Sequence, residues 1–307
     1  MKTPSSTLLP FRMCTALLPL LAIVLASPDA GAFCRTTTSR SSTAEEGGCA
    51  TEGKALYHPL AKLSYRIVPS EPTIPTAILA EKMAKAFEHW TSRNARCTPG
   101  ISVEVLPPAA KSVPTIAGFD RRGGNANDFG ISSIPSYGSS EQLAMATLHF
   151  NSATGVILDV DLEIDTKPKW SFTEEAPPAD GTDLEAILTH NAGHVLGLAH
   201  SDVPTSVMFP TYEPGSIAQR TLDPDDIEAI CTIYPSREQR LSATGLVATS
   251  TCSSPLEDPA AGCTVPETSA GSDGCSAAPP SGGGLAVPGV ALLLGLAAAV
   301  RRRRALR

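Results

Sequence analysis

Alternating apolar and polar positions in the middle of the chain predict β-strands on either side of an amphipathic helix. Residues Leu63–Val68 and Ile101–Leu106 alternate with the period of two that is typical of half-buried strands. The helix between them is predicted from apolar residues that recur three or four positions apart, namely Leu79, Met83, Phe87 and Trp90. We expect these residues to form core, so this region indicates a fold and no chemistry.

Two further alternating stretches predict a β-hairpin. Residues Leu143–Phe150 and Val156–Ile164 flank the turn-forming sequence Asn-Ser-Ala-Thr-Gly. His149, on the first stretch, is expected to be a structural or rim histidine and not a metal ligand. The polar positions of the second stretch are acidic, namely Asp159, Asp161 and Glu163. These carboxylates form either a solvated face or a calcium site.

Two more helices are predicted from their start signals. Thr182 and Glu185 have the spacing of a capping box and precede an apolar pair at residues 187–188. The dipeptide Asp223-Pro224 places a capping carboxylate before a proline at the first helical position. The first of these two helices carries the residues that point to a function.

Three histidines lie in and after this helix, with spacings of four and then six residues. His190 and His194 are about one turn apart on the same helical face, so their imidazoles can converge on one metal ion. Gly197 can take the left-handed conformation that ends a helix, which would return His200 to the same ion. Three protein ligands leave one position of a tetrahedral zinc open, where a water molecule acquires a pKa near ~7.

These residues resemble the metzincin zinc-protease signature, His-Glu-x-x-His-x-x-Gly-x-x-His, and their surroundings resemble its matrixin branch over about residues 58–235. Met208 is similar to the family's Met-turn methionine, and Pro210 and Tyr212 are similar to the segment that walls its primed-side pocket. The resemblance implies an α+β fold of metzincin (zincin-like) type, in which a twisted mixed β-sheet carries an active-site helix and two further helices. It also implies that an extended substrate adds to the edge of the strand at 143–150.

The sequence departs from the family pattern at Asn191, which stands where the family has a glutamate. In the family, that carboxylate takes a proton from the attacking water and passes it to the leaving nitrogen. An asparagine amide has no accessible basicity, and general acid–base catalysis is typically worth about 100- to 10,000-fold in rate. Glu185, on another part of the helical turn, is a poor substitute. Asp225 and Asp226 resemble residues that cap and brace the last helix, so we expect no catalysis from them.

Three hypotheses about function follow. The first is an impaired zinc metalloendopeptidase in which Asn191 only positions the water by hydrogen bonding. The second is a pseudoprotease that binds zinc and an extended peptide without cleaving it. The third is a displayed scaffold, which would not need a metal-competent histidine triad.

The two ends of the chain predict export and membrane attachment. Residues 1–32 have the basic start, apolar run and small-residue cleavage site of a secretory signal, with a retained N-terminal anchor as the alternative. The other end has a Pro/Gly/Ser-rich stretch, an apolar segment and Arg301–Arg304, as in a short membrane span with its arginines inside. It resembles the tripartite C-terminal sorting tags of myxobacterial surface proteins, in which a cysteine before the span, here Cys275, is the anchoring point. This resemblance implies display at the cell surface, with a plain tail anchor as the alternative.

Seven cysteines remain outside the predicted signal, an odd number for an oxidising compartment. Local spacing suggests the pairs Cys34–Cys49 and Cys252–Cys263, which leaves Cys97 to pair with Cys231 and Cys275 as the odd residue, although sequence alone does not fix the connectivity. In a competing hypothesis, Cys34 or Cys49 ligates the zinc and keeps the site latent.

The charge balance argues against a nucleic-acid partner. The 307-residue chain has a net charge of −7, and residues 33–300 contain 17 basic against 30 acidic side chains. We expect a monomer whose partner is an extended peptide or protein, with the membrane contacted only through the C-terminal segment. The predicted units are a signal peptide (1–32), an N-terminal extension (33–57), a matrixin-like domain (58–236), a linker with the sorting cysteine (237–283), a transmembrane segment (284–300) and a basic tail (301–307).

Overall fold

The computed structural model describes most of the central part of the chain. The described residues are 33–39, 49–69, 73–108, 118–119, 126–133 and 142–250, together with the backbone of 268–277. The predicted signal peptide, the Cys252–Cys263 pair, the transmembrane segment and the basic tail lie outside these residues. Within the described residues, no helix has both the length and the apolar character needed to cross a membrane.

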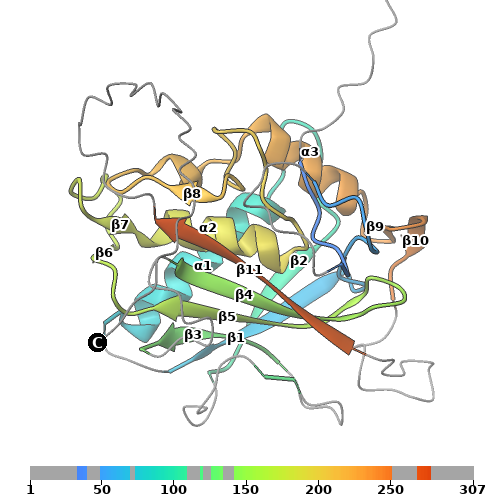
Figure 1. Cartoon of the computed structure of the whole chain (residues 1–307), viewed down its shortest axis with the longest axis horizontal. Helices are drawn as coiled ribbons and strands as arrows, with labels where there is room; N and C mark the ends of the chain where they lie inside the picture. The colour runs from blue at the N-terminus through green and yellow to red at the C-terminus, as the bar shows by residue number, and fades with distance from the viewer. Residues whose placement is uncertain are drawn as a thin grey trace, which may run out of the picture.

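A mixed seven-stranded sheet forms the base of the fold, in the order β2-β1-β3-β5-β4-β11-β8 (Figure 1). β2, β1, β3 and β5 run parallel to one another, whereas β4 is antiparallel to both β5 and β11. The strands are β1 (Lys62–Val68), β2 (Ser102–Leu106), β3 (Asn127–Ser132), β4 (Gln142–Asn151), β5 (Ile157–Asp165), β8 (Thr211–Tyr212) and β11 (Thr268–Ala277).

Three α-helices accompany this sheet. They are α1 (Thr76–Thr91), α2 (Leu184–Val195) and α3 (Pro224–Ile233), and the 3₁₀ turn η2 (Ala218–Arg220) precedes α3. α1 packs against α2, β1 and β2, and α2 also packs against β4, so α2 is held between α1 and the edge of the sheet (Figure 1). Two small two-stranded sheets complete the fold, one of β6 (Trp170–Ser171) and β7 (Thr182–Asp183), the other of β9 (Gln239–Ser242) and β10 (Gly245–Ala248).

The core joins the sheet to α1 through aromatic side chains. The rings of Tyr65 on β1 and Phe129 on β3 stack with centroids 4.8 Å apart, and Phe87 of α1 lies 5.2 Å from Tyr65. All three side chains are buried. Burial of each aromatic side chain stabilises the fold by roughly 1.5–3 kcal/mol, so this cluster fixes the position of α1 and, through it, of α2.

The elements predicted from periodicity are confirmed, with β3 as an addition. β1, α1, β2 and the β4–β5 hairpin lie where the alternation predicts them, and the hairpin is antiparallel with Ala144 opposite Ile164. The predicted capping box from Thr182 to Glu185 is wrong. Thr182 lies in β7, and the Asp183 side chain caps α2 by accepting from the N–H of Ala186 at 2.7 Å. The Glu185 side chain forms an ion pair with Lys82 of α1.

Packing continues past the predicted domain boundary at residue 236. The β9–β10 hairpin follows α3, and the Arg240 side chain on β9 is wholly buried. Its guanidinium donates to the carbonyl oxygens of Leu60, Gly100 and Ser236 at 2.6–3.2 Å. The predicted linker also contains an element, since residues 268–277 form β11. The folded unit therefore includes β9, β10 and β11.

Candidate metal centre

The three histidines predicted to bind metal come together beside α2. His190 and His194 lie on the helix and His200 follows it, and one nitrogen from each ring lies within 4.8 Å of the others. His190 and His194 are fully buried. The ring centroids are 4.7–5.2 Å apart, so the imidazoles surround a common point.

Backbone carbonyls fix which nitrogen of two of these rings can bind a metal. The Nδ1 atom of His190 is 2.7 Å from the carbonyl oxygen of Val207, and that of His194 is 2.9 Å from the carbonyl oxygen of Leu198. A carbonyl oxygen only accepts, so both Nδ1 atoms carry the proton and both Nε2 atoms present lone pairs. The buried Nε2 of His190 has no hydrogen-bond partner in the described part of the chain. These donors fit zinc, which prefers neutral imidazole nitrogen.

Burial keeps the rings in the form that binds metal. Loss of solvation, with repulsion from the neighbouring imidazoles, lowers the pKa of His190 well below its ordinary value, and the same causes lower the pKa of His194 to about 3. Both rings are therefore neutral at physiological pH, and no proton has to leave before a cation binds.

The turn that returns His200 to the site depends on Gly197. This residue has φ +92°, its N–H donates to the carbonyl oxygen of His194 at 2.8 Å, and the N–H of Leu198 donates to that of Gly193 at 3.0 Å. This is the Schellman arrangement that ends a helix, and glycine adopts its positive φ without strain. The role predicted for Gly197 is confirmed.

The N-terminal segment straps this turn in place. The N–H of Thr36 donates to the carbonyl oxygen of Gly197 at 3.0 Å, and the N–H of Ala199 donates to that of Cys34 at 3.0 Å. Cys34 is in a disulfide with Cys49, as the spacing suggests, and a second disulfide joins Cys97 to Cys231. The competing hypothesis that Cys34 or Cys49 ligates the zinc is wrong for this structure, because neither has a thiolate to offer.

Two side chains satisfy the last carbonyls of α2. The Nε2 of His58 donates to the carbonyl oxygen of Val195 at 2.6 Å, and the hydroxyl of Tyr234 donates to that of Leu196 at 2.7 Å. Burial lowers the pKa of His58 from 6.5 to about 4. The helix end beside the metal site therefore depends on a neutral buried histidine.

We expect the stability of the protein to fall in acid because of His58. Its folded-state pKa is below its unfolded value, so its contribution is complete above pH 6.5 and is lost as the pH falls towards 4. The loss approaches about 1.4 kcal/mol per pH unit in that window. Urea unfolding of the wild type and His58→Gln between pH 7 and 4 tests this, since glutamine can donate the same bond but does not titrate. Equal pH slopes for the two proteins would contradict it.

Met208, the predicted Met-turn methionine, lies close to Gly193 of α2, and its Met-turn role stays a prediction. It is buried, and Asp226 of α3 holds the turn around it. The Asp226 carboxylate accepts from the hydroxyl of Ser206 at 2.6 Å and from the N–H groups of Val207 and Met208 at 2.8 and 3.3 Å. It also accepts from the N–H of Asp223, the N-cap of α3. The bracing role expected for Asp226 is confirmed.

Contact between Met208 and α2 requires the absence of a side chain at position 193. A Cβ atom on Gly193 would lie 2.2 Å from the Sδ of Met208 and 2.9 Å from the Trp90 ring. We therefore expect Gly193→Ala to destabilise the protein by about 1–3 kcal/mol, the range for overpacking. Urea unfolding checks this, with Gly118→Ala as the control because a Cβ there meets nothing within 4 Å. Equal losses for the two variants would show that the Met208 contact does not limit this position.

Comparison with known proteins agrees with this geometry. Residues 131–235 match the family described as Matrixin. The chain is 30% identical to mouse matrilysin over 175 residues, which is 57% of this chain and 58% of that protein. It is 37% identical over 79 residues to Drosophila melanogaster matrix metalloproteinase-2, covering 26% of this chain and 10% of that protein, and 27% identical over 177 residues to human matrix metalloproteinase-20, covering 57% and 35%. This domain has the matrixin fold. The chain spans less than two thirds of the length of each of these relatives.

Asn191 lies on α2 between two metal-site histidines. Its side chain is fully buried, and its amide nitrogen donates to the carbonyl oxygen of Ile187, one helical turn earlier, at 2.8 Å. The amide therefore bonds to its own helix. Glu185, the other side chain considered as a base, faces α1 and bonds to Lys82 at 2.9 Å and to His89 at 3.2 Å. Burial opposes its charge, but these hydrogen bonds outweigh burial and lower the pKa of Glu185, so it is a weak base.

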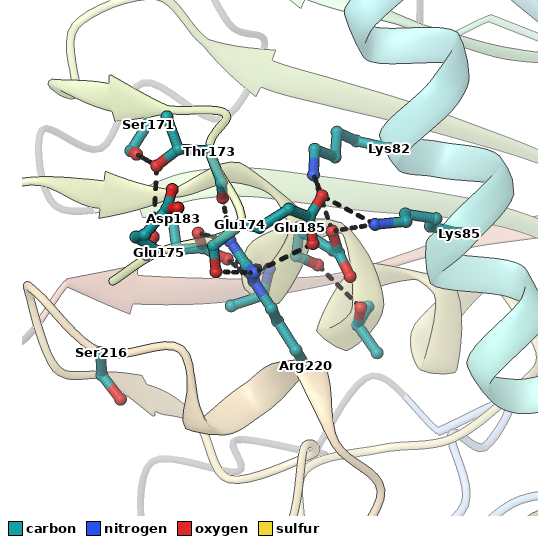
Figure 2. A network of polar contacts seen from close by, with 12 residues as sticks. Lys82, Lys85, Ser171, Thr173, Glu174, Glu175, Asp183, Glu185, Ser216 and Arg220 are labelled. Carbon is teal, nitrogen blue, oxygen red and sulfur yellow. Dashed lines mark hydrogen bonds and ion pairs between the residues drawn. The ribbon is translucent and has the colours of Figure 1, made fainter. Parts of the chain in front are cut away.

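A network of charged side chains holds the first turn of α2 in place (Figure 2). The Arg220 guanidinium binds both oxygens of Asp183, at 2.8 and 2.5 Å, and donates to the carbonyl oxygens of Thr173 and Glu174. Lys82 bridges Glu174 and Glu185 at 2.9 Å each. The network holds α2 to α1 and η2, and sequence analysis missed it because its members lie 37 to 103 residues apart.

The predicted pocket residues lie on β8 or directly before it. Tyr212 is buried on β8, where its hydroxyl accepts from the N–H of Asp183 at 2.9 Å and donates to the carbonyl oxygen of Ser216 at 2.8 Å. Burial raises the pKa of Tyr212 to about 12, so its hydroxyl stays protonated. Half-buried Pro210 directly precedes β8. Their role in a substrate pocket stays a prediction.

A second group of possible metal ligands lies on β4 and β5. His149, Asp159 and Asp161 bring one ligand atom each within 4.8 Å of one another, and Glu163 is outside this group. Burial, together with repulsion from the neighbouring carboxylates, raises the pKa of Asp159 to about 9. The expectation of a rim role for His149 missed this grouping. The clue was its register, since His149 pairs with Asp159 across the hairpin. An imidazole among the donors suits zinc better than calcium, which prefers oxygen ligands.

Proposed function

We propose that this protein is a zinc metallopeptidase of matrixin type that holds an extended peptide between β4 and β8 and hydrolyses it slowly. The observation that supports the proposal is the triad of His190, His194 and His200, with its neutral rings and oriented nitrogens. The similarity to the mouse and rat proteins named matrilysin also supports the proposed activity.

Each part of the site has a task in this proposal. Zinc, when bound, supplies Lewis acidity at the position left open by the three histidines. The amides and carbonyls of β4 that face away from β5 pair with the peptide as an added strand in place of β11, and β8 borders it on the other side. Asn191 can donate or accept a hydrogen bond but takes no proton at neutral pH, so proton transfer to the leaving nitrogen is left to water. The expected result is peptide binding with impaired turnover.

The position of Asn191 also favours a second candidate, a pseudoprotease that binds zinc and peptide without cleavage. Its amide is hydrogen bonded to Ile187, and Glu185 is paired with Lys82, so neither supplies a base. The two candidates share the metal and the groove and differ only in turnover.

Secretion agrees with the two disulfides and with the matrixin fold. Attachment to the cell surface through the C-terminal segment and processing at Cys275 are part of the proposal. Membrane partition of the full chain, compared with Cys275→Ser, would test the anchoring separately from the chemistry at α2.

The metal is tested first. By elemental analysis we expect His194→Gln, which loses a ligand, to contain about one zinc per chain less than the wild type. Zinc should also raise the melting temperature of the wild type and leave that of His194→Gln unchanged, because only a formed site links binding to folding. His149→Gln is the control that separates this site from the second group on β4 and β5. Equal zinc content in wild type and His194→Gln would refute the proposal.

A further inference from the structure

In the sheet, the place between β4 and β8 is occupied by another strand of the same chain, β11. β11 pairs antiparallel with β4 from Thr268 opposite Asn151 to Ser276 opposite Gln142. Its last two residues then pair in parallel with β8, Ser276 with Thr211 and Ala277 with Tyr212. In Figure 1, β11 is the red strand that crosses α2 between these two edges, and it lies against α2. An extended peptide substrate is expected on the same two edges.

The sequence of β11 is that of a ligand strand and not of a core strand. Its ten residues, Thr-Ser-Ala-Gly-Ser-Asp-Gly-Cys-Ser-Ala, include two glycines and no large apolar side chain. Such residues have low strand propensity and bury little apolar area. What β11 offers is a run of backbone donors and acceptors, which is how added peptide strands bind to a sheet edge. A strand held in this way can leave without opening the core.

Because β11 belongs to the same chain as its binding site, its binding is intramolecular. Residues 251–267, seventeen in all, join the β9–β10 end of the domain to β11. A ligand that belongs to the same chain as its site can have an effective concentration up to the order of millimolar, so that even a weakly binding strand can stay in place. A free peptide must compete against that concentration to enter the groove.

We propose that residues 268–277 are an intramolecular ligand of the peptide groove, which they occupy in place of an extended peptide. This rests on the proposed function in one respect, that the groove between β4 and β8 is the peptide site. Docking closes the groove, and release of the tail opens it to another extended chain. The partner class that displaces the tail is an unfolded or extended polypeptide with a free backbone edge.

The test uses the full chain with Ser272→Pro and Asp273→Pro together. Two adjacent prolines remove one N–H from each edge of β11, so its pairing with β4 is interrupted whichever of the two amides faces β4. Ala260→Pro with Ala261→Pro is the matched control, with the same number of prolines outside β11. Hydrogen exchange of residues 142–151 reports whether the tail is docked, because the β4 amides that face β11 lose their acceptors when it leaves. We expect exchange of these amides to be about tenfold faster or more in the β11 variant, and unchanged in the control.

A second readout measures access to the groove. The probe is a fluorescent decapeptide with the sequence of residues 268–277 carrying Cys275→Ser, and its anisotropy is followed with each protein. We expect the β11 variant to bind it at least about tenfold more tightly than the wild type and the control. Equal exchange of β4 in all three proteins would overturn the proposal, and so would measurable probe binding of equal affinity by wild type and variant. Faster exchange with no probe binding by any protein would uphold the docked tail and count against the proposed peptide-binding function.

Discussion

Replacing Asn191 with glutamate is expected to raise peptide hydrolysis by about 100- to 10,000-fold, the typical contribution of general acid–base catalysis. The position lies on α2 between His190 and His194, so a longer side chain with a carboxylate there is next to the metal site. The carboxylate can accept a proton from water and return it to the leaving nitrogen, which the amide cannot do. The measurement is turnover of a mixed peptide library by the zinc-loaded full chain.

Two comparisons make this result interpretable. Asn191→Gln has the length of glutamate without its basicity, and we expect no gain from it. Each protein is also tested with Ser272→Pro and Asp273→Pro, so that a docked β11 does not hide turnover. Hydrolysis by Asn191→Glu alone would identify the natural protein as a pseudoprotease. Similar rates for wild type and Asn191→Glu would mean that the argument from the missing base is wrong.

The largest loss of stability is expected from Arg220→Met. Asp183 has no solvent exposure, and Arg220 is its bidentate partner with a side chain only 10% exposed. Removing the guanidinium leaves a buried carboxylate without its counter-ion, which typically destabilises a protein by about 3–5 kcal/mol. Because Asp183 caps α2, we expect this loss of stability to affect α2 most. Urea unfolding measures it.

The control for this prediction is an ion pair on the solvent-exposed surface of the protein. Lys169 and Asp180 form a pair whose side chains are 72% and 67% exposed. Lys169→Met should change the free energy of unfolding little, because exposed pairs are solvated and screened. Similar losses for Arg220→Met and Lys169→Met would contradict the role given to burial. A further expectation is weaker zinc retention in Arg220→Met alone.

The sequence predicted the metal site well because its signal is local. Two histidines a turn apart, a glycine at the helix end and a third histidine lie within eleven residues, and helical geometry alone brings the first two together. The β4–β5 hairpin was predictable for the same reason, since its partners are neighbours in the chain. Hydrophobic periodicity also located α1, because a helix that packs on a sheet buries one face.

Elements that depend on distant partners were not predictable in this way. β3 has only Phe129 and Ile131 as large apolar residues, and its place between β1 and β5 is fixed by pairing with both. β11 has no apolar pattern, so composition predicted a linker where backbone pairing with β4 makes a strand. The sequence pattern predicts the cap of α2 at Thr182, one residue early. The bond between Glu185 and Lys82 joins α2 to another helix and cannot be seen in the local sequence. In each case the deciding interaction is absent from the local sequence.

The hydrogen bonds between the N-terminal segment and the turn after α2 bear on the order in which the domain folds. Thr36 reaches Leu198 across 162 positions, and Arg35 donates to the carbonyl oxygen of Leu241 across 206. The loop that carries His200 is therefore completed only when both ends of the domain are present, and contacts of such long range form late in folding. We therefore expect α2 to place His190 and His194 before the turn that carries His200 is fixed. Full zinc affinity is then expected only in the completely folded chain.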